Sequence, residues 1–433
     1  LYHYRVTALV DGEPITTANF ECDTFFNYEP RPIAEVSASA QTVERWFGKP
    51  LPADLGARRG LAVILGIDDG SKLVALTESS RLRIVAWDTD KDRVQRVRTM
   101  LHEKGLYGTH VAVHWTRALE AVPTTVYCAN LVASERPDDV FASSSTREQA
   151  RRLLAPNGYG ALGDGDWARG KAIPGSGEWS HIYGAADNSA FGGEQLSGIR
   201  SADDLTIQWL GRPGSRYQVD RQGRKPPPIA VGGHIFLQGL HRVVALDIYN
   251  GTVLWSMEVP RMERFNMPRD CGNWCADSDH LYAVMNDRCW KIEAATGNIA
   301  NMYDSVPDGV QVNRDYDWGY IAQDGAQLFA SGVRPGSSWV QYWGKIGWYD
   351  SPTGEVTNKI CSDYLFSLDK ESGSLLWKYE NRVIINSTIT LRDGRVYLVE
   401  SRNPKVRDDE SRRVGASELW QDQYLVALDA SNG

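Results

Sequence analysis

The second half of the sequence repeats a short pattern, and this repeat limits the possible folds more than any other feature. Four stretches place strand-like phrases around a turn that closes on a glycine. The phrases VALDIYNGTVLW, FSLDKESGSLLW and VALDASNG carry the pattern most clearly. Repetition of about four strands per unit is typical of a β-propeller. We therefore expect residues 164–433 to form part of a β-propeller. The turn glycines are Gly251, Gly297, Gly373 and Gly433.

The repeated turn has an aspartate ahead of its glycine and, in two units, a tryptophan four residues after it. An aspartate can accept hydrogen bonds from the turn that follows, and glycine tolerates the positive φ needed to close it. Tryptophan is a large flat group suited to stacking between blades. In the second unit Glu293 replaces the aspartate and Asn301 replaces the tryptophan, so we expect weaker stacking there. The aspartates are Asp247, Asp369 and Asp429, and the tryptophans are Trp255 and Trp377.

Residues 60–163 show a different pattern, in which strands alternate with helices. The apolar runs LAVILG (61–66) and RIVAWD (83–88) are typical of parallel strands buried on both faces. Asp90 is placed to cap the helix predicted over KDRVQRVRTMLHEKGL. Such alternation indicates an open parallel sheet with helices on its faces. We therefore expect a small Rossmann-like α/β domain ahead of the repeats.

The first residues predict β structure followed by a connection. Residues 1–28 alternate in a strand-like way around the turn DGEP, and residues 29–59 are a Pro-rich linker with a short helix at QTVERWF. The phrase LYHYRVTALVDGE resembles the end of a fibronectin type III module, or of the similar sandwich in purple acid phosphatases. That resemblance implies the closing hairpin of a β-sandwich whose earlier strands precede Leu1. Because Gly433 also ends a strand-like phrase, we expect the chain to be a piece of a longer polypeptide.

Composition argues against several broad classes. A net charge of −8 and a pI near 5.6 disfavour a nucleic-acid-binding protein, which would need a basic patch. No apolar run approaches the length of about 18 residues that a transmembrane helix needs. Of six cysteines, Cys271 and Cys275 are close enough in sequence to form a disulfide, although free thiols are the alternative. No second close ligand pair accompanies them, so we expect no metal site.

The repeat phrases resemble those of pyrroloquinoline-quinone-type propellers, and residues 177–193 resemble the lead-in to their first blade. That family contains quinoprotein dehydrogenases as well as cofactor-free outer-membrane assembly lipoproteins. The resemblance therefore implies a fold but no cofactor, and it implies a periplasmic or secreted location. Pyrroloquinoline quinone is the less favoured cofactor, because no motif requires the residues that could bind it with calcium. Those residues are Asp270, Asn273, Asp315, Asp317 and Trp318.

The α/β segment resembles the class I S-adenosylmethionine-dependent methyltransferase fold. In that family a glycine-rich loop after the first strand approaches the methionine portion of the ligand, and an acid ending the second strand binds the ribose. The resemblance implies a site in which Asp88 is the ribose acid, and Asp68 replaces the middle glycine of the loop. A side chain at that position would crowd the backbone approach. We interpret the domain as degenerate, with S-adenosylmethionine binding as the alternative. The implied site residues are Gly66, Asp68, Gly70 and Asp88.

These features favour a non-catalytic binding or scaffold protein over two alternatives, an active methyltransferase and a quinoprotein dehydrogenase. Insertions at 334–362 and 402–422 interrupt the third and fourth units at the same point, so we expect both on one face. Five aromatics in the first insertion suit a protein, peptide or carbohydrate partner. Alternatively, they cover the rim of the propeller itself. These aromatics are Trp339, Tyr342, Trp343, Trp348 and Tyr349.

Overall fold

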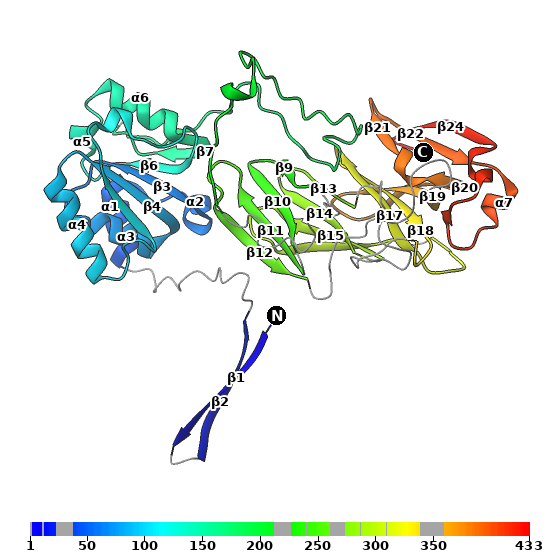
Figure 1. Ribbon diagram of the computed structural model, residues 1–433, viewed down its shortest axis with the longest axis horizontal. Coiled ribbons are helices and arrows are strands. Elements are labelled where there is room, and N and C mark those ends of the chain that lie inside the picture. Colours follow the sequence, from blue (N-terminus) through cyan, green and yellow to red (C-terminus); the bar gives the residue numbers. More distant parts are fainter. Residues whose placement is uncertain are drawn as a thin grey trace.

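The protein combines one α/β sheet with several antiparallel sheets, as the computed structural model shows (Figure 1). An antiparallel hairpin of β1 (Tyr2–Val10) and β2 (Glu13–Cys22) precedes them, as the alternating pattern predicted. A fibronectin-type sandwich remains a prediction. The structure describes residues 2–10, 13–22, 38–163, 165–211, 227–239, 241–259, 273–285, 287–308, 310–337 and 359–433.

The α/β sheet has the strand order β5-β4-β3-β6-β7-β8. Its first five strands are parallel, and the short β8 runs antiparallel to β7. This arrangement confirms the Rossmann-like prediction. The strands are β3 (Arg59–Leu65), β4 (Arg81–Asp88), β5 (Val111–Trp115), β6 (Ala129–Ala133), β7 (Leu154–Gly160) and β8 (Ala168–Arg169).

Helices cover both faces of this sheet. Along β3, Ile64 belongs to the core under α1, α3 and α4, whereas the next residue, Leu65, belongs to the core under α5 and α6. Asp90 caps α4 as predicted, accepting hydrogen bonds from the backbone N–H groups of Asp92 and Arg93. The helices are α1 (Ala38–Phe47), α2 (Ala53–Ala57), α3 (Ser71–Ser79), α4 (Lys91–Glu103), η1 (Leu119–Ala121), α5 (Pro137–Val140) and α6 (Ser144–Leu153).

The repeat region forms successive antiparallel sheets, as the sequence repeat predicted. The first two have the orders β12-β11-β10-β9 and β13-β14-β15-β16. The third and fourth units, β17–β20 and β21–β24, join into one larger sheet through β20 and β22. Among the described residues these sheets do not close into a ring, so the propeller itself remains a prediction.

The elements of the repeat region are β9 (Ile229–Val231), β10 (His234–Gly239), β11 (Arg242–Asp247), β12 (Val253–Glu258), β13 (Trp274–Ala276), β14 (His280–Met285), β15 (Arg288–Glu293), β16 (Ile299–Asp304), β17 (Asp317–Asp324), β18 (Gln327–Val333), β19 (Lys359–Asp369), β20 (Leu375–Ile385), η4 (Asn386–Thr388), β21 (Thr390–Arg392), β22 (Arg395–Ser401), α7 (Pro404–Arg407), β23 (Arg413–Val414), η5 (Ser417–Trp420) and β24 (Gln423–Asp429). The short helix η2 (Ala202–Asp204) precedes them.

Aromatic side chains connect each sheet to the turn of the next one. Trp255 on β12 donates from Nε1 to the carbonyl of Ala294 at 2.7 Å, and a Cβ added to Gly297 would lie 2.6 Å from its ring. In the second unit the expectation from Asn301 was wrong. Tyr303, two residues further along β16, donates to the carbonyl of Lys370 at 2.5 Å, and its ring lies on Gly373. Stacking is therefore retained in the unit that lacks the tryptophan.

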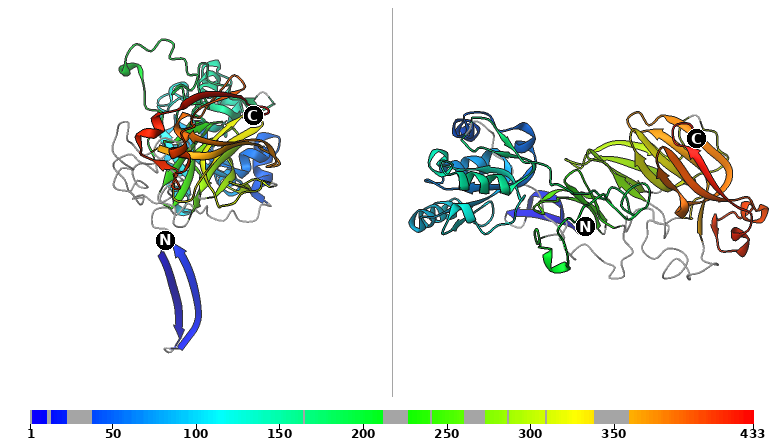
Figure 2. Two further views of the ribbon diagram at one scale, coloured as in Figure 1. Left: turned by 90° about the vertical axis from the view of Figure 1, so that its right-hand side faces the viewer. Right: turned by 90° about the horizontal axis from the view of Figure 1, so that it is seen from above.

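The lead-in segment 177–193 contacts one strand from each repeat unit. Trp179 pairs with Ala230 of β9, and the carbonyl of Ser180 accepts from the N–H of Ala276 on β13 at 2.9 Å. Nε2 of His181 accepts from the N–H of Gln323 on β17 at 3.2 Å. Further on, the carbonyl of Ala186 accepts from the N–H of Leu391 on β21 at 3.0 Å. The segment therefore ties the units together across the row of sheets seen in Figure 2.

Two further expectations concern cysteines and membranes. Cys275 is a buried free thiol, which favours the free-thiol alternative, while Cys271 lies outside the described residues. In the described part of the chain, no helix is both long and apolar enough to span a membrane.

Candidate functional site

The predicted site residues meet at the carboxyl edge of the α/β sheet. Gly66 and Gly70 lie in the loop between β3 and α3, with φ values of 79° and 82° that favour glycine. Asp88 ends the neighbouring strand β4, and its Oδ2 accepts from the N–H of Ile67 at 2.9 Å. The fold therefore brings the loop and the acid together, as the motif spacing predicted.

Asp88 is completely buried, and donors from the domain itself surround its carboxylate. The backbone N–H of Asp90 donates to Oδ1 at 2.8 Å. Arg93 Nη1 lies 3.2 Å from both carboxylate oxygens, and Arg136 Nη2 donates to Oδ2 at 3.1 Å. Together with Ile67, these groups match or exceed the acceptor capacity of a carboxylate, which is about four hydrogen bonds.

The sequence analysis missed the two arginines that pair with Asp88. Arg93 lies in the first turn of α4, five residues after Asp88, so its closeness was open to prediction. Arg136 lies 48 residues away, where β6 leads into α5, and its Nε also donates to the carbonyl of Ile67 at 2.9 Å. Only the packing of β6 beside β3 brings Arg136 to the site.

A second carboxylate, that of Glu135, occupies the glycine-rich loop. It accepts from the backbone N–H groups of Asp68 at 2.6 Å, Gly70 at 3.3 Å and Lys72 at 3.1 Å. Burial raises the pKa of Glu135 above its ordinary value, although the N–H of Asp68 acts in the opposite direction. Backbone N–H groups at the start of a helix are a ready-made anion site. Here the protein supplies the anion itself.

The space that the loop glycines leave open is filled by side chains of the domain. A Cβ added to Gly66 would lie 2.5 Å from Cγ2 of Val140 on α5. At Gly70 it would lie 2.7 Å from Cε of Met100 and 2.8 Å from Cγ1 of Val97, both on α4. Asp68, which replaces the family's middle glycine, has an exposed side chain.

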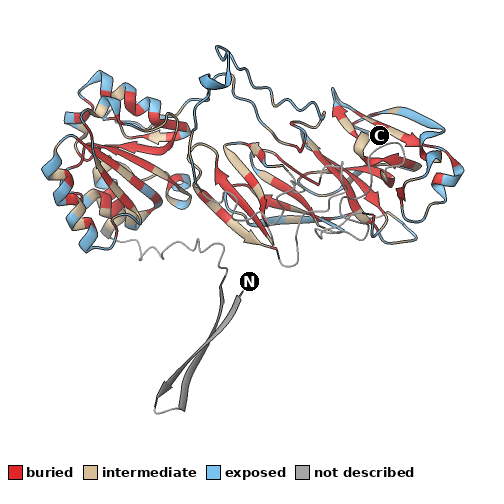
Figure 3. Ribbon diagram, viewed as in Figure 1, coloured by how far each residue is buried: buried red, intermediate tan, exposed pale blue. Residues whose placement is uncertain are grey.

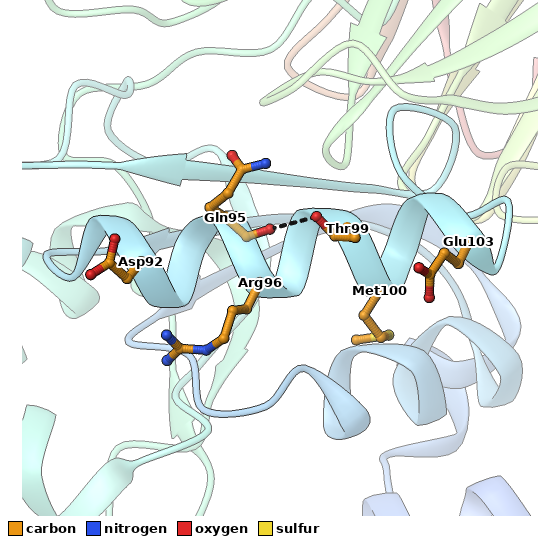
Figure 4. Close-up of a pocket in the computed structure, with 6 residues that line it drawn as sticks. All are labelled: Asp92, Gln95, Arg96, Thr99, Met100 and Glu103. Atoms are coloured by element: carbon orange, nitrogen blue, oxygen red, sulfur yellow. Dashed lines mark hydrogen bonds between the residues drawn. The ribbon is translucent and has the colours of Figure 1, made fainter.

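A pocket of about 490 Å³ lies along α4, away from these residues (Figure 4). Its lining comes from α4 alone and contains none of the four predicted site residues. It therefore contributes nothing to the candidate site. The lining residues are Asp92, Gln95, Arg96, Thr99, Met100 and Glu103.

A polar cluster that the sequence analysis missed joins the opposite, amino edge of the sheet to the first repeat. Asn130 on β6 is buried, and its Nδ2 donates to Asp247 Oδ2 at 2.9 Å. Its Oδ1 accepts from the N–H of Leu61 at 2.8 Å and from Asn250 Nδ2 at 3.0 Å. Arg58 lies 3.6 Å from Asp247. The repeat aspartate that caps its own turn thus also binds the α/β domain.

The residues considered for a quinone and calcium are only partly within the described chain. Asn273 and Trp318 are buried, Asp315 is exposed, and burial raises the pKa of Asp317. Asp270 lies outside the described residues. Across the part of the chain that the structure describes, no three His, Cys, Asp or Glu side chains are grouped to hold a metal ion.

The insertions of the third and fourth units meet where they are described. Ser337 Oγ donates to the carbonyl of Ser411, and β23 pairs with β19. This agrees with the prediction that both insertions lie on one face. The five aromatics proposed to bind a partner lie outside the described residues; they are Trp339, Tyr342, Trp343, Trp348 and Tyr349.

Neither a protein-family model nor a curated protein matches the chain. Among solved structures, it is similar to a protein from Methanococcus maripaludis assigned as an S-adenosyl-L-methionine-dependent methyltransferase, with 19% identity over 30% of this chain and 54% of that one, and a TM-score of 0.24. It is also similar to geranyl diphosphate C-methyltransferase from Streptomyces coelicolor, with 13% identity over 28% of this chain and 43% of that one, and a TM-score of 0.23.

A third similar structure is the YcgJ protein of Bacillus subtilis, with 15% identity over 28% of this chain and 47% of that one, and a TM-score of 0.22. The chain thus spans about half the length of these three proteins. The Rossmann-like assignment of the α/β domain rests on its own strand order and parallel pairing.

Proposed function

We propose that this chain is a non-catalytic binding or scaffold protein whose α/β domain has a structural role and holds no S-adenosylmethionine. One observation carries the proposal: donors from the domain itself occupy both carboxylate oxygens of Asp88. A ligand ribose would need this carboxylate free.

The energetics of exchange support the proposal. Breaking a buried ion pair by removing one partner costs about 3–5 kcal/mol, because it leaves an uncompensated charge. A ribose hydroxyl that displaced Arg136 would form a hydrogen bond to Asp88 with a neutral donor. Charge-assisted hydrogen bonds are roughly twice as strong as hydrogen bonds between neutral groups. The exchange is therefore unfavourable unless other contacts of the ligand compensate for it.

An S-adenosylmethionine-binding domain, and with it an active methyltransferase, is the second candidate. It is favoured by the strand order and by the position of Asp88, which ends the second strand beside a loop with two positive-φ glycines. For this function Arg136 and Glu135 would have to leave the loop on binding.

Calorimetry with S-adenosylhomocysteine distinguishes the two candidates. We expect no binding heat with the unmodified protein. A heat of binding that disappears in Asp88→Asn and persists in Asp68→Ala would overturn the proposal, provided that both variants keep their melting temperature. Binding that emerges only in Arg136→Ala would support it, because Arg136 would then be the group that blocks the acid.

The partner surface proposed for this scaffold is the aromatic insertion of the third unit. Aromatic side chains are enriched at the centres of protein interfaces. Deleting residues 338–350 and probing glycan and peptide arrays tests this surface. Loss of an array signal with an unchanged melting temperature supports it, whereas loss of folding would mean that these residues cover the protein's own rim.

A further inference from the structure

Residues 205–210, ahead of the first repeat sheet, are extended and pair with no strand in the described chain. They belong to the arch coloured as exposed in Figure 3. Their apolar side chains Leu205, Ile207 and Leu210 are all exposed. An unpaired segment with exposed apolar side chains is a site where another strand can add.

Trp209 in this segment makes the contact that elsewhere belongs to an outermost strand. Its Nε1 donates to the carbonyl of Ile248 at 2.8 Å, and a Cβ on Gly251 would overlap its ring. The equivalent rings on later turns come from β12, β16 and β20, each the last strand of its unit. Residues 205–210 therefore have the position of an outermost strand that belongs to a sheet preceding the first.

Sequence and exposure agree with this placement. The residues Thr-Ile-Gln-Trp at 206–209 match Thr-Val-Leu-Trp at 252–255 on β12. Two positions before the ring, Val253 is 7% exposed, whereas the equivalent Ile207 is 68% exposed. The difference corresponds to the sheet that covers β12 and that residues 205–210 lack.

The last repeat unit has the opposite deficiency. Its third strand, β24, pairs with β22 and with no other strand of the described residues, whereas β11, β15 and β19 each lie between two strands. Leu425 on β24 is 78% exposed. The residues at the same repeat position are fully buried: Val243, Cys289 and Leu365.

We propose that residues 205–210 of one copy pair with the free edge of β24 in a second copy of the chain. One partner is an outermost strand without a sheet, and the other is a sheet without an outermost strand. Within one chain they belong to opposite ends of the row, because β13 contacts both β9 and β17 and the fourth unit follows the third. Such a head-to-tail contact closes into a ring or extends as a filament.

Sedimentation over a range of chain concentrations tests this proposal. We expect the unmodified chain to associate as its concentration rises, and we expect both Ile207→Asp and Leu425→Asp to sediment as monomers. Leu196→Asp is the matched control, since Leu196 is 65% exposed on the same arch but lies outside the proposed strand. All three side chains are exposed, so circular dichroism should show unchanged folding.

Mixing the two variants provides the decisive measurement. Ile207→Asp keeps an intact β24 edge and Leu425→Asp keeps an intact strand 205–210, so the mixture should form a one-to-one pair that grows no further. Failure of the mixture to associate would show that the two segments do not meet. A monomeric wild type, or an equal loss in Leu196→Asp, would also overturn the proposal, and the first outcome would assign the segment to a different sheet-bearing partner.

Discussion

The carboxyl edge of the α/β sheet and the junctions between the repeat sheets both match a sequence motif, but different interactions hold them together. At the edge, the carboxylates of Asp88 and Glu135 are buried and surrounded by donors of the domain. At the junctions, neutral N–H and O–H groups of aromatic rings donate to carbonyls, and the rings lie on glycines. A buried charge requires partners, whereas a ring on a glycine requires only space. A motif therefore predicts the second kind of contact better than the first.

The largest effect that can break this comparison is the removal of the buried charge. Asp88→Ala should destabilise the α/β domain by about 4 kcal/mol, because it leaves Arg93 and Arg136 without their partner. Hydrogen exchange of the β3 and β4 amides measures this free energy. Asp68→Ala is the control and should change stability by less than about 0.5 kcal/mol, because its side chain is exposed. A small effect at Asp88 would mean that the acid is not structural.

Acid should affect the two regions with opposite sign. Burial lowers the pKa of His181 from 6.5 to about 4, so the folded state holds it neutral. Its contribution to stability is complete above pH 6.5 and is lost as the pH falls toward 4, by about 3 kcal/mol in total. Glu135 has a raised pKa, so its contribution increases as the pH falls through the same range. Hydrogen exchange against pH, compared with His181→Asn, should show the loss in the repeat sheets alone.

The contact between the two regions predicts an intermediate effect. Asp247→Ala should cost about 2 kcal/mol, because it removes the buried acceptor of Asn130 and Tyr249. It should also increase exchange in both β3 and β12. Asp429→Ala removes the same repeat position where only Ser431 donates to it, so its effect should be smaller and confined to the last unit. Equal effects would indicate that Asp247 serves only its own turn.

The smallest effect isolates the ring-on-glycine contact. Gly297 and Gly394 both have positive φ, so alanine should cost about 1 kcal/mol of backbone strain at either position. Only at Gly297 would the new Cβ meet a ring, that of Trp255, which should add about 1 kcal/mol more. Nothing lies within 4 Å of a Cβ at Gly394. Calorimetric melting of both variants measures the difference, and equal shifts would argue against the contact.

Local pattern was sufficient to predict much of the fold. The alternation of apolar strands and helices predicted the parallel sheet, and Asp90 was correctly expected to cap α4. The repeat predicted successive antiparallel sheets and the contact of Trp255 with the next turn. Tyr303 was missed, because a strict count of four residues after the glycine points to Asn301 instead.

The sequence by itself determined the elements and brought Asp88 beside the glycine-rich loop, because strand periodicity and capping act over a few residues. Only the tertiary structure decided what those residues bind. Arg136 reaches Asp88 across 48 positions, and Asn130 reaches Asp247 across 117. A carboxylate buried by folding takes the nearest available donors, and their positions depend on how distant strands pack. In this protein those donors come from the chain itself.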